Sequence, residues 1–259
     1  MGRRQTIKTS FQNPIHRVFE LQKPFTFFHT HVLDQTVMNK ATKSGKSLEV
    51  DVSIDDNGQI FVGHPLSEYE FDHLPPPSNL PLEEVIAQSK AANLFLVLDC
   101  KDVRLLPAVQ KVIKGYGAER CAIHSFTDAL SFKPWPPKVQ AVAKPGWIPG
   151  ELPLEELLEL KLATEAPLIL SCHGLTAERV ESEKEQIMKR VLDVAKNDVE
   201  VVNFYMPKDE LMPLDLADEL IKQHVLPLIP VDRTPSEACP KIYLGATDIV
   251  EQASDLKDF

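Results

Sequence analysis

The sequence predicts an α/β protein built as a (β/α)8 TIM barrel. Short apolar runs, typical of buried parallel strands, recur along the 259-residue chain, and stretches of helical length lie between them. A chain of this length with 43% hydrophobic residues can bury the core that one such barrel requires. We therefore expect a polar N-terminal arm over residues 1–23 and a single barrel over residues 24–259.

The first elements are expected to be a strand, a helix and a second strand. An apolar aromatic run over 24–28 predicts the first strand, which ends in His29-Thr30-His31. A helix is expected over 34–44, with Gly45 as its C-terminal stop, and the second strand over 47–52. Such a short connection is typical of a right-handed βαβ unit with parallel strands.

The rest of the chain alternates in the same way. Helices are expected over 81–92, 103–115, 154–162, 177–196 and 214–223, and strands over 94–98, 121–124, 139–143, 168–171, 199–204, 225–229 and 242–245. Together with the first two strands this gives nine candidates for the eight strands of a barrel. Either 139–143 or 168–171 is then extra, or the barrel is irregular; an open doubly wound sheet is the alternative fold.

The second strand begins a hairpin that carries the first chemical groups. Apolar and polar residues alternate along it, so that Glu49 and Asp51 share a face. The turn chemistry of Asp-Asp-Asn-Gly then reverses the chain and returns His64 to this strand. If Ile54 pairs with Gln59, His64 lies opposite Glu49, whereas a tighter turn places it opposite Asp51. A solvated hairpin with an acidic outer face is the alternative.

Charged residues also follow the third strand. The apolar run 94–98 ends in Asp99-Cys100-Lys101, which places Asp99 and Lys101 on one face at the carboxyl end of the strand. In a barrel the carboxyl ends of all strands meet at one mouth. The groups expected there are His29 (or, less directly, His31), Glu49, Asp51, His64, Asp99 and Lys101. His124, Ser125 and His173 also follow strand-like runs, where they either line the mouth or are ordinary polar strand ends.

Three carboxylates at one mouth would repel one another unless they shared a cation. We therefore expect a divalent ion that prefers oxygen ligands, Mg²⁺ as the first choice and Ca²⁺ as the second. Two histidines beside such an ion are suited to general acid and general base catalysis near neutral pH. Lys101 would neutralise an anionic substrate, although an ion pair with Asp99 is the structural alternative.

The composition restricts the partners. The formal net charge of −10 argues against nucleic acid and against non-specific binding to anionic lipid. The sequence contains no apolar run of membrane-spanning length and no secretory signal, and its four cysteines show no paired spacing. We expect reduced thiols in a core, a cytoplasmic location and a small-molecule or lipid substrate.

Together these residues resemble a known family. The pattern His…Glu-x-Asp…His…Asp-x-Lys is similar to that of the glycerophosphodiester phosphodiesterase and phosphatidylinositol-phospholipase-C-like superfamily of (β/α)8 barrels. LEVDVSIDDNGQIFVGH resembles its second strand and hairpin, LFLVLDCKD the third strand, CAIHSFTDAL the fourth and KIYLGATDIVEQ the closing strand. The resemblance covers most of the chain from about Phe25 and is strongest between His29 and Lys101.

This resemblance implies a phosphodiesterase of lipid metabolism that cleaves a glycerophosphodiester or a (lyso)phospholipid. It also implies the role of each residue: Glu49, Asp51 and Asp99 as ligands of Mg²⁺ or Ca²⁺, His29 and His64 as the catalytic acid–base pair, and Lys101 as a substrate contact. The sequence departs from the family at His29-Thr30-His31, where His-Arg-Gly is usual, and the 20-residue spacing to Glu49 resembles the sphingomyelinase D branch. The alternatives are a non-catalytic barrel that binds a phosphorylated ligand and an interaction protein with a vestigial site.

Overall fold

The computed structural model describes residues 25–30, 33–44, 47–64, 79–135, 151–204, 214–223, 225–228 and 244–250. Its strands are β1 (Phe25–Thr30), β2 (Ser47–Ile54), β3 (Ile60–Val62), β4 (Leu96–Cys100), β5 (Cys121–Ser131), β6 (Glu151–Leu152), β7 (Leu168–His173), β8 (Val201–Phe204), β9 (Leu226–Leu228) and β10 (Leu244–Val250). Its α-helices are α2 (Gln35–Ser44), α4 (Leu82–Ala91), α5 (Leu106–Tyr116), α7 (Leu154–Thr164), α8 (Ala177–Ser182), α9 (Lys184–Ala195) and α10 (Leu214–Lys222). Short 3₁₀ turns, η1 (Val103–Leu105) and η2 (Ala118–Arg120), flank α5.

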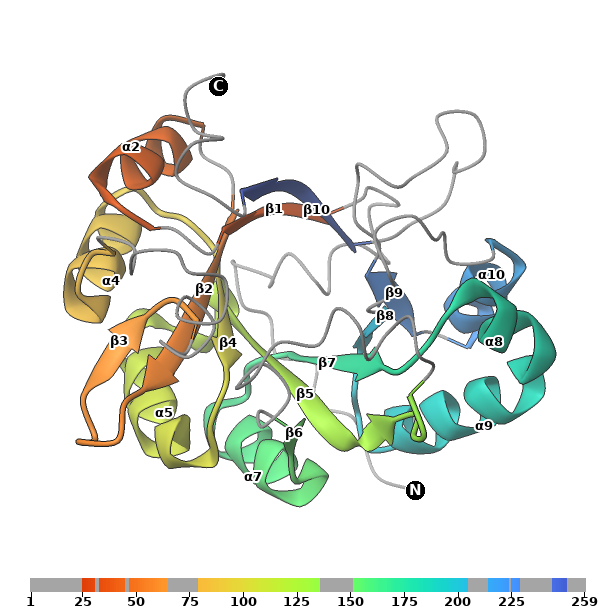
Figure 1. Ribbon diagram of the computed structural model, residues 1–259. Coiled ribbons are helices and arrows are strands. Elements are labelled where there is room, and N and C mark those ends of the chain that lie inside the picture. Colours follow the sequence, from red (N-terminus) through yellow and green to blue (C-terminus); the bar gives the residue numbers. More distant parts are fainter. Residues whose placement is uncertain are drawn as a thin grey trace, which may run out of the picture.

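The described strands close into a parallel ring. Its order is β1, β10, β9, β8, β7, β5, β4 and β2, and a pairing of β1 with β2 completes the circle. Figure 1 views the ring approximately down its central axis and shows the helices on its outside. The predicted α/β fold and (β/α)8 barrel are therefore confirmed.

The ring also settles which candidates are barrel strands. The segment 168–171 lies in β7, so it belongs to the ring, and the eight paired strands do not require 139–143. The segment 139–143 itself, the expected arm 1–23, His31 and Cys239 lie outside the described residues. The other predicted helices and strands are present within a few residues of their expected bounds, and the division into an arm and one domain stays a prediction.

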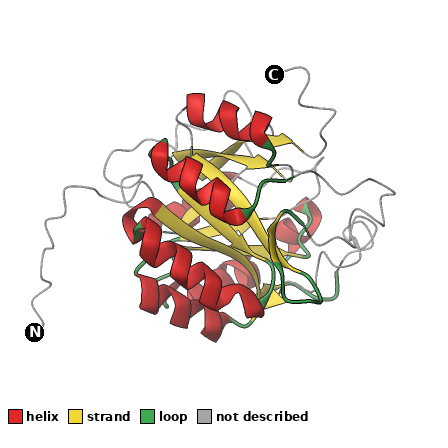
Figure 2. Ribbon diagram, turned by 90° about the vertical axis from the view of Figure 1, so that its left-hand side faces the viewer, coloured by secondary structure: helices red, strands yellow, loops and turns green. Residues whose placement is uncertain are grey.

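Apolar packing between the strands and the outer helices holds the ring. The outward residues Leu48, Val50 and Val52 of β2 are at most 1% exposed and belong to the core between the strands and the outer helices. Each such aliphatic side chain contributes roughly 1.5–3 kcal/mol when fully buried. The side view in Figure 2 shows the helices packed over the strands. Because this outer core satisfies the apolar face of β2, its other face is left to carry polar groups into the ring.

The hairpin β2–β3 differs in register from both versions expected. Ile54 pairs with Ile60 rather than with Gln59. The reason lies in the turn, where the Asp55 carboxylate accepts hydrogen bonds from the backbone N–H groups of Asn57 (2.9 Å) and Gln59 (2.7 Å). Gly58 allows this loop because its φ is +81°. The hairpin nevertheless brings His64 to Asp51, the carboxylate that the tighter turn was expected to place opposite it, rather than to Glu49.

The other differences concern lengths. The helix expected over 177–196 is divided into α8 and α9 at Glu183, and the fourth strand of the ring, β5, extends to Ser131. Cys100, Cys121 and Cys172 are buried in β4, β5 and β7, as expected for core residues. Among the described helices, none is both long and apolar enough to cross a membrane.

Candidate metal centre

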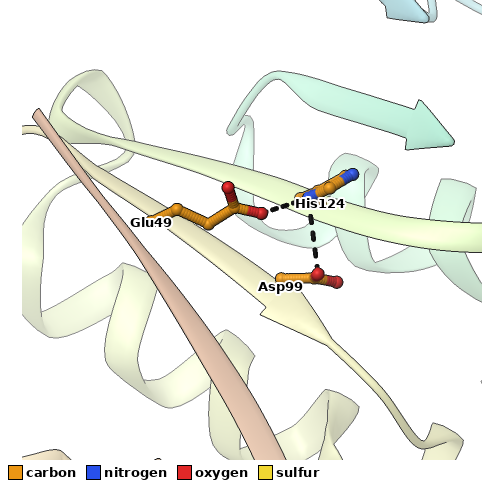
Figure 3. A group of neighbouring side chains, drawn as sticks. All are labelled: Glu49, Asp99 and His124. Atoms are coloured by element: carbon orange, nitrogen blue, oxygen red, sulfur yellow. Dashed lines mark hydrogen bonds and ion pairs between the residues drawn. The ribbon is translucent and has the colours of Figure 1, made fainter. Parts of the chain in front are cut away.

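Three neighbouring strands bring a carboxylate, a second carboxylate and an imidazole together. Asp99 of β4 is aligned with His124 of β5 and with Asp51 of β2, and Glu49 lies two residues before Asp51 on the same face. Ligand atoms of Glu49, Asp99 and His124 all lie within 4.8 Å of one another, and all three residues are buried. His124 Nδ1 is 2.7 Å from Glu49 Oε1 and 3.5 Å from Asp99 Oδ2 (Figure 3). Among the described residues this is the group that can hold a metal ion.

A second set of charged groups adjoins the first through Asp99. Lys101 Nζ lies 2.5 Å from Asp99 Oδ2 and 3.0 Å from Asp51 Oδ1. The other oxygen of Asp51 is 3.1 Å from His64 Nε2. Asp51, Asp99 and His64 are almost fully buried, and 13% of the Lys101 side chain is exposed. The carboxylates Glu49, Asp51 and Asp99 are thus linked through cationic or imidazole groups.

The pKa values follow from these contacts. Burial alone would lower the pKa of Lys101, but the charges of Asp51 and Asp99 outweigh it and raise the pKa well above its ordinary value. Burial likewise opposes protonation of His124, and the nearby Asp99 and Glu49 carboxylates raise its pKa above the ordinary value. The carboxylates therefore keep Lys101 charged, and they favour a charged His124.

The ring of His124 is held on its other edge by residues of the neighbouring strands β7 and β8. Its Nε2 lies 2.6 Å from Ser171 Oγ, and the amide of Asn203 donates a hydrogen bond of 2.7 Å to the same hydroxyl. Ser171 belongs to β7 and Asn203 to β8. Such outer contacts fix the orientation of a histidine that binds metal through its other nitrogen. His124 Nδ1 is therefore directed at the carboxylates.

The donor set fits a divalent cation. Asp99 Oδ1 is buried and accepts no hydrogen bond from the described part of the chain, so this oxygen is available to a cation in the site as described. Two carboxylates and an imidazole are ligands that Mg²⁺ and related ions use, with water completing the shell. The expectation of a carboxylate-rich site for Mg²⁺ or Ca²⁺ is confirmed by this group.

The other expected residues have different positions. His29 lies in β1, next to β2 in the ring, and its side chain is outside the described residues. Ser125 turns away from the centre and donates a hydrogen bond of 2.9 Å to the carbonyl of Cys100. From the sequence, His124 was expected only as a possible mouth residue. The sequence held one clue to its position. Asp99 is the fourth residue of β4 and His124 is the fourth residue of β5, so parallel pairing of these consecutive strands places the two side by side.

Comparisons with known proteins support the fold. No family model matches the chain, and no curated protein matches it. A crystal structure of phosphonopyruvate hydrolase is similar, with a TM-score of 0.51 and 12% sequence identity over 92% of this chain and 80% of that one. A 2,3-dimethylmalate lyase of the PEP mutase/isocitrate lyase superfamily has a TM-score of 0.45 and 11% identity, covering 91% and 80%. Orotidine 5'-monophosphate decarboxylase from Methanocaldococcus jannaschii has a TM-score of 0.46 and 14% identity, covering 89% and 90%.

These neighbours correct the family expected from the sequence. The reported structure with a TM-score above 0.5 is a phosphonopyruvate hydrolase, not a glycerophosphodiester phosphodiesterase. The expected family was therefore wrong, and so were the phosphodiesterase activity and the place in lipid metabolism inferred from it. The physical reason is that acids and histidines at strand ends are a general property of barrel mouths. The contacts of Asp51 with Lys101 and His64, and of His124 with Glu49, likewise differ from the arrangement that the resemblance implied.

Proposed function

We propose that this protein is a metal-dependent hydrolase that acts on a small anionic substrate with two chelating oxygens, such as a 2-oxo carboxylate or phosphonate. The observation that carries the proposal is the buried Oδ1 of Asp99, which lies beside Glu49 and His124 and accepts no hydrogen bond from any residue that the structure describes. A bound divalent cation would polarise the carbonyl of such a substrate and stabilise the negative charge that develops there. The bond broken would be the C–C bond next to that carbonyl or a C–P bond one carbon away from it, and the name of the similar phosphonopyruvate hydrolase suggests the second.

The chain's own residues would divide the remaining tasks. Glu49 and Asp99, with Asp51 beside them, would hold the ion. Lys101 lies at the end of β4, where its ammonium would bind the anionic group of the substrate. His64, oriented by Asp51, would transfer a proton, and His29 keeps its proposed place as the other acid–base residue. A cytoplasmic location accompanies this proposal, because core thiols are typical of a reducing compartment.

Two measurements test the proposal together. The first is thermal unfolding of the full chain in EDTA and in Mg²⁺; an ion at 100 times its dissociation constant should stabilise the fold by about 2.7 kcal/mol. Asp99→Asn should abolish this gain, whereas Asp56→Asn, an exposed carboxylate in the hairpin turn, should keep it.

The second measurement is turnover of a panel of 2-oxo acids, 2-hydroxy acids and phosphonopyruvate, followed by proton and phosphorus NMR. We expect Mg²⁺-dependent cleavage of at least one compound and loss of that cleavage in Asp99→Asn. Stabilisation by Mg²⁺ without any turnover would leave a metal-binding barrel and refute the hydrolase.

A further inference from the structure

A second polar cluster lies at the carboxyl ends of β5 and β7. His173 Nε2 is 2.6 Å from Glu151 Oε1, and the Ser131 hydroxyl donates a hydrogen bond of 2.8 Å to the same oxygen. The other oxygen of Glu151 accepts a hydrogen bond of 3.0 Å from Lys133, whose side chain is 59% exposed. The Glu151 carboxylate thus contacts an exposed lysine with one oxygen and, with the other, the buried imidazole of His173, which is 5% exposed.

The hydrogen bonds determine which nitrogen of His173 carries the proton. Burial would raise the pKa of Glu151, but the contacts with Lys133, Ser131 and His173 outweigh it and lower the pKa below its ordinary value. The carboxylate is therefore an acceptor, and Nε2 of His173 must donate. Burial also lowers the pKa of His173, in spite of Glu151, and so favours the neutral ring. A neutral ring with a proton on Nε2 leaves a bare lone pair on Nδ1.

That lone pair has no hydrogen-bond partner among the described residues. Nδ1 of His173 is buried and makes no hydrogen bond within the described residues. Two aromatic rings stand edge-on to the imidazole, Phe126 at 5.3 Å and Trp135 at 5.1 Å between ring centroids, and neither offers an acceptor or donor contact to Nδ1. Buried polar atoms are normally satisfied, so an unsatisfied nitrogen of this kind indicates a ligand or a catalytic role.

The cluster faces the same mouth as the metal centre. Ser171 and His173 lie two residues apart on β7 and so share its inner face, and Ser171 contacts His124. The Phe126 ring is near both imidazoles, with centroids 6.3 Å from His124 and 5.3 Å from His173. A substrate held at the metal centre would therefore have His173 beside it, on the side opposite to His64 and Asp51.

We propose that His173 is a proton acceptor for the reaction at the metal centre, with Glu151 and Ser131 as its positioning residues. This inference rests on the proposed hydrolase. Water would bond through its oxygen to the carbonyl carbon or the phosphorus, and one of its protons would pass to Nδ1. The C–C or C–P bond then breaks, the leaving carbon takes a proton from His64 on the other side, and the imidazolium of His173, which Glu151 stabilises, releases its proton to solvent.

Kinetics of three variants test the role. His173→Phe keeps a ring without nitrogen, and His173→Asn keeps a polar group near Nδ1 that cannot take up a proton. Both should lower kcat by about 10²–10⁴-fold with little change in KM, and both should bind Mg²⁺ as the parent does. Lys196→Met is the matched control, because it removes an exposed ion pair with Asp193 on α9, outside both clusters, and should keep kcat near the parental value. Full kcat in His173→Asn would overturn the proposal.

Nitrogen NMR of the histidine rings keeps this test separate from that of the proposed function. With the His173 signals assigned by their loss in His173→Phe, we expect a protonated Nε2 and a bare Nδ1 at neutral pH in the Mg²⁺-loaded protein. Glu151→Gln should shift the proton toward Nδ1. If no compound of the panel is cleaved, the proposed hydrolase activity is refuted, and this spectrum alone tests whether Nδ1 of His173 is free to accept a proton. A proton on Nδ1 in the parent protein would overturn the proposal for His173.

Discussion

Replacing Lys101 by methionine should change stability and metal affinity in opposite directions. The Lys101 ammonium lies within 3.0 Å of oxygens of Asp51 and Asp99, and both carboxylates are buried. Removing one partner of a buried ion pair typically costs about 3–5 kcal/mol, because the other charge is left uncompensated. At about 2–4 °C per kcal/mol for a chain of this size, the metal-free variant should unfold on the order of 10 °C below the parent.

Mg²⁺ should reverse part of that loss. Two unit charges 4 Å apart interact by roughly 4 kcal/mol at an effective dielectric constant of 20, so the ammonium strongly disfavours a cation on the same carboxylates. We therefore expect Lys101→Met to bind Mg²⁺ at least about tenfold more tightly than the parent, which corresponds to roughly 1.4 kcal/mol.

Calorimetric titration with Mg²⁺ and thermal unfolding in EDTA measure the two effects. Lys196→Met is the matched control, since its exposed ion pair with Asp193 should contribute no more than about 1 kcal/mol. If Lys101→Met had the stability of the parent in EDTA and the same Mg²⁺ affinity, the ammonium of Lys101 would not be what neutralises the charges of Asp51 and Asp99, and the reasoning would be refuted.

Three further predictions concern the surrounding structure. The pKa values of Glu151 and His173 are both lowered in the folded state, so the unfolded chain binds more protons and stability should fall as the pH drops below the ordinary values of 6.5 and then 4.5. Urea unfolding at several pH values should show a smaller fall for His173→Phe, and an equal fall would contradict this. Gly174→Ala should lower stability by about 1–3 kcal/mol, because φ is +82° and the new Cβ would lie 2.5 Å from the neighbouring tryptophan ring; an unchanged melting temperature would contradict it. Tyr116→Phe should cost about 1 kcal/mol in urea unfolding by removing the buried 2.7 Å hydrogen bond to the carbonyl of Leu94, and the reasoning fails if the variant is as stable as the parent.

The barrel could be predicted because its strands are local patterns. Each apolar run buried on both faces, such as 94–98 and 168–171, is visible without knowledge of its neighbours. The count of strands was less certain, since an apolar run such as 139–143 looks the same whether or not it joins the ring. The hairpin register was missed because it depends on side-chain hydrogen bonds of Asp55, which shift the pairing by one residue.

The part of the site that depends on patterns within single strands was predicted, and the part that depends on how strands align was not. Glu49, Asp51, Asp99 and Lys101 stand out because each follows from alternation within one strand, and the structure brings them together. The close contact of His124 with Glu49 depends on the alignment of separate strands, which no single segment encodes. The family assignment failed because it relied on residue types that any barrel mouth can carry, without the contacts that distinguish one chemistry from another.

The central claim is that Glu49, Asp99 and His124 bind a divalent cation. A crystal structure of the protein grown with Mn²⁺, which reports its own position by anomalous scattering, tests this most directly. We predict one anomalous peak bonded to all three residues at about 2.0–2.6 Å, with Lys101 moved away from Asp99. A map without such a peak, in which the Lys101 ammonium still bridges Asp51 and Asp99, would contradict the claim.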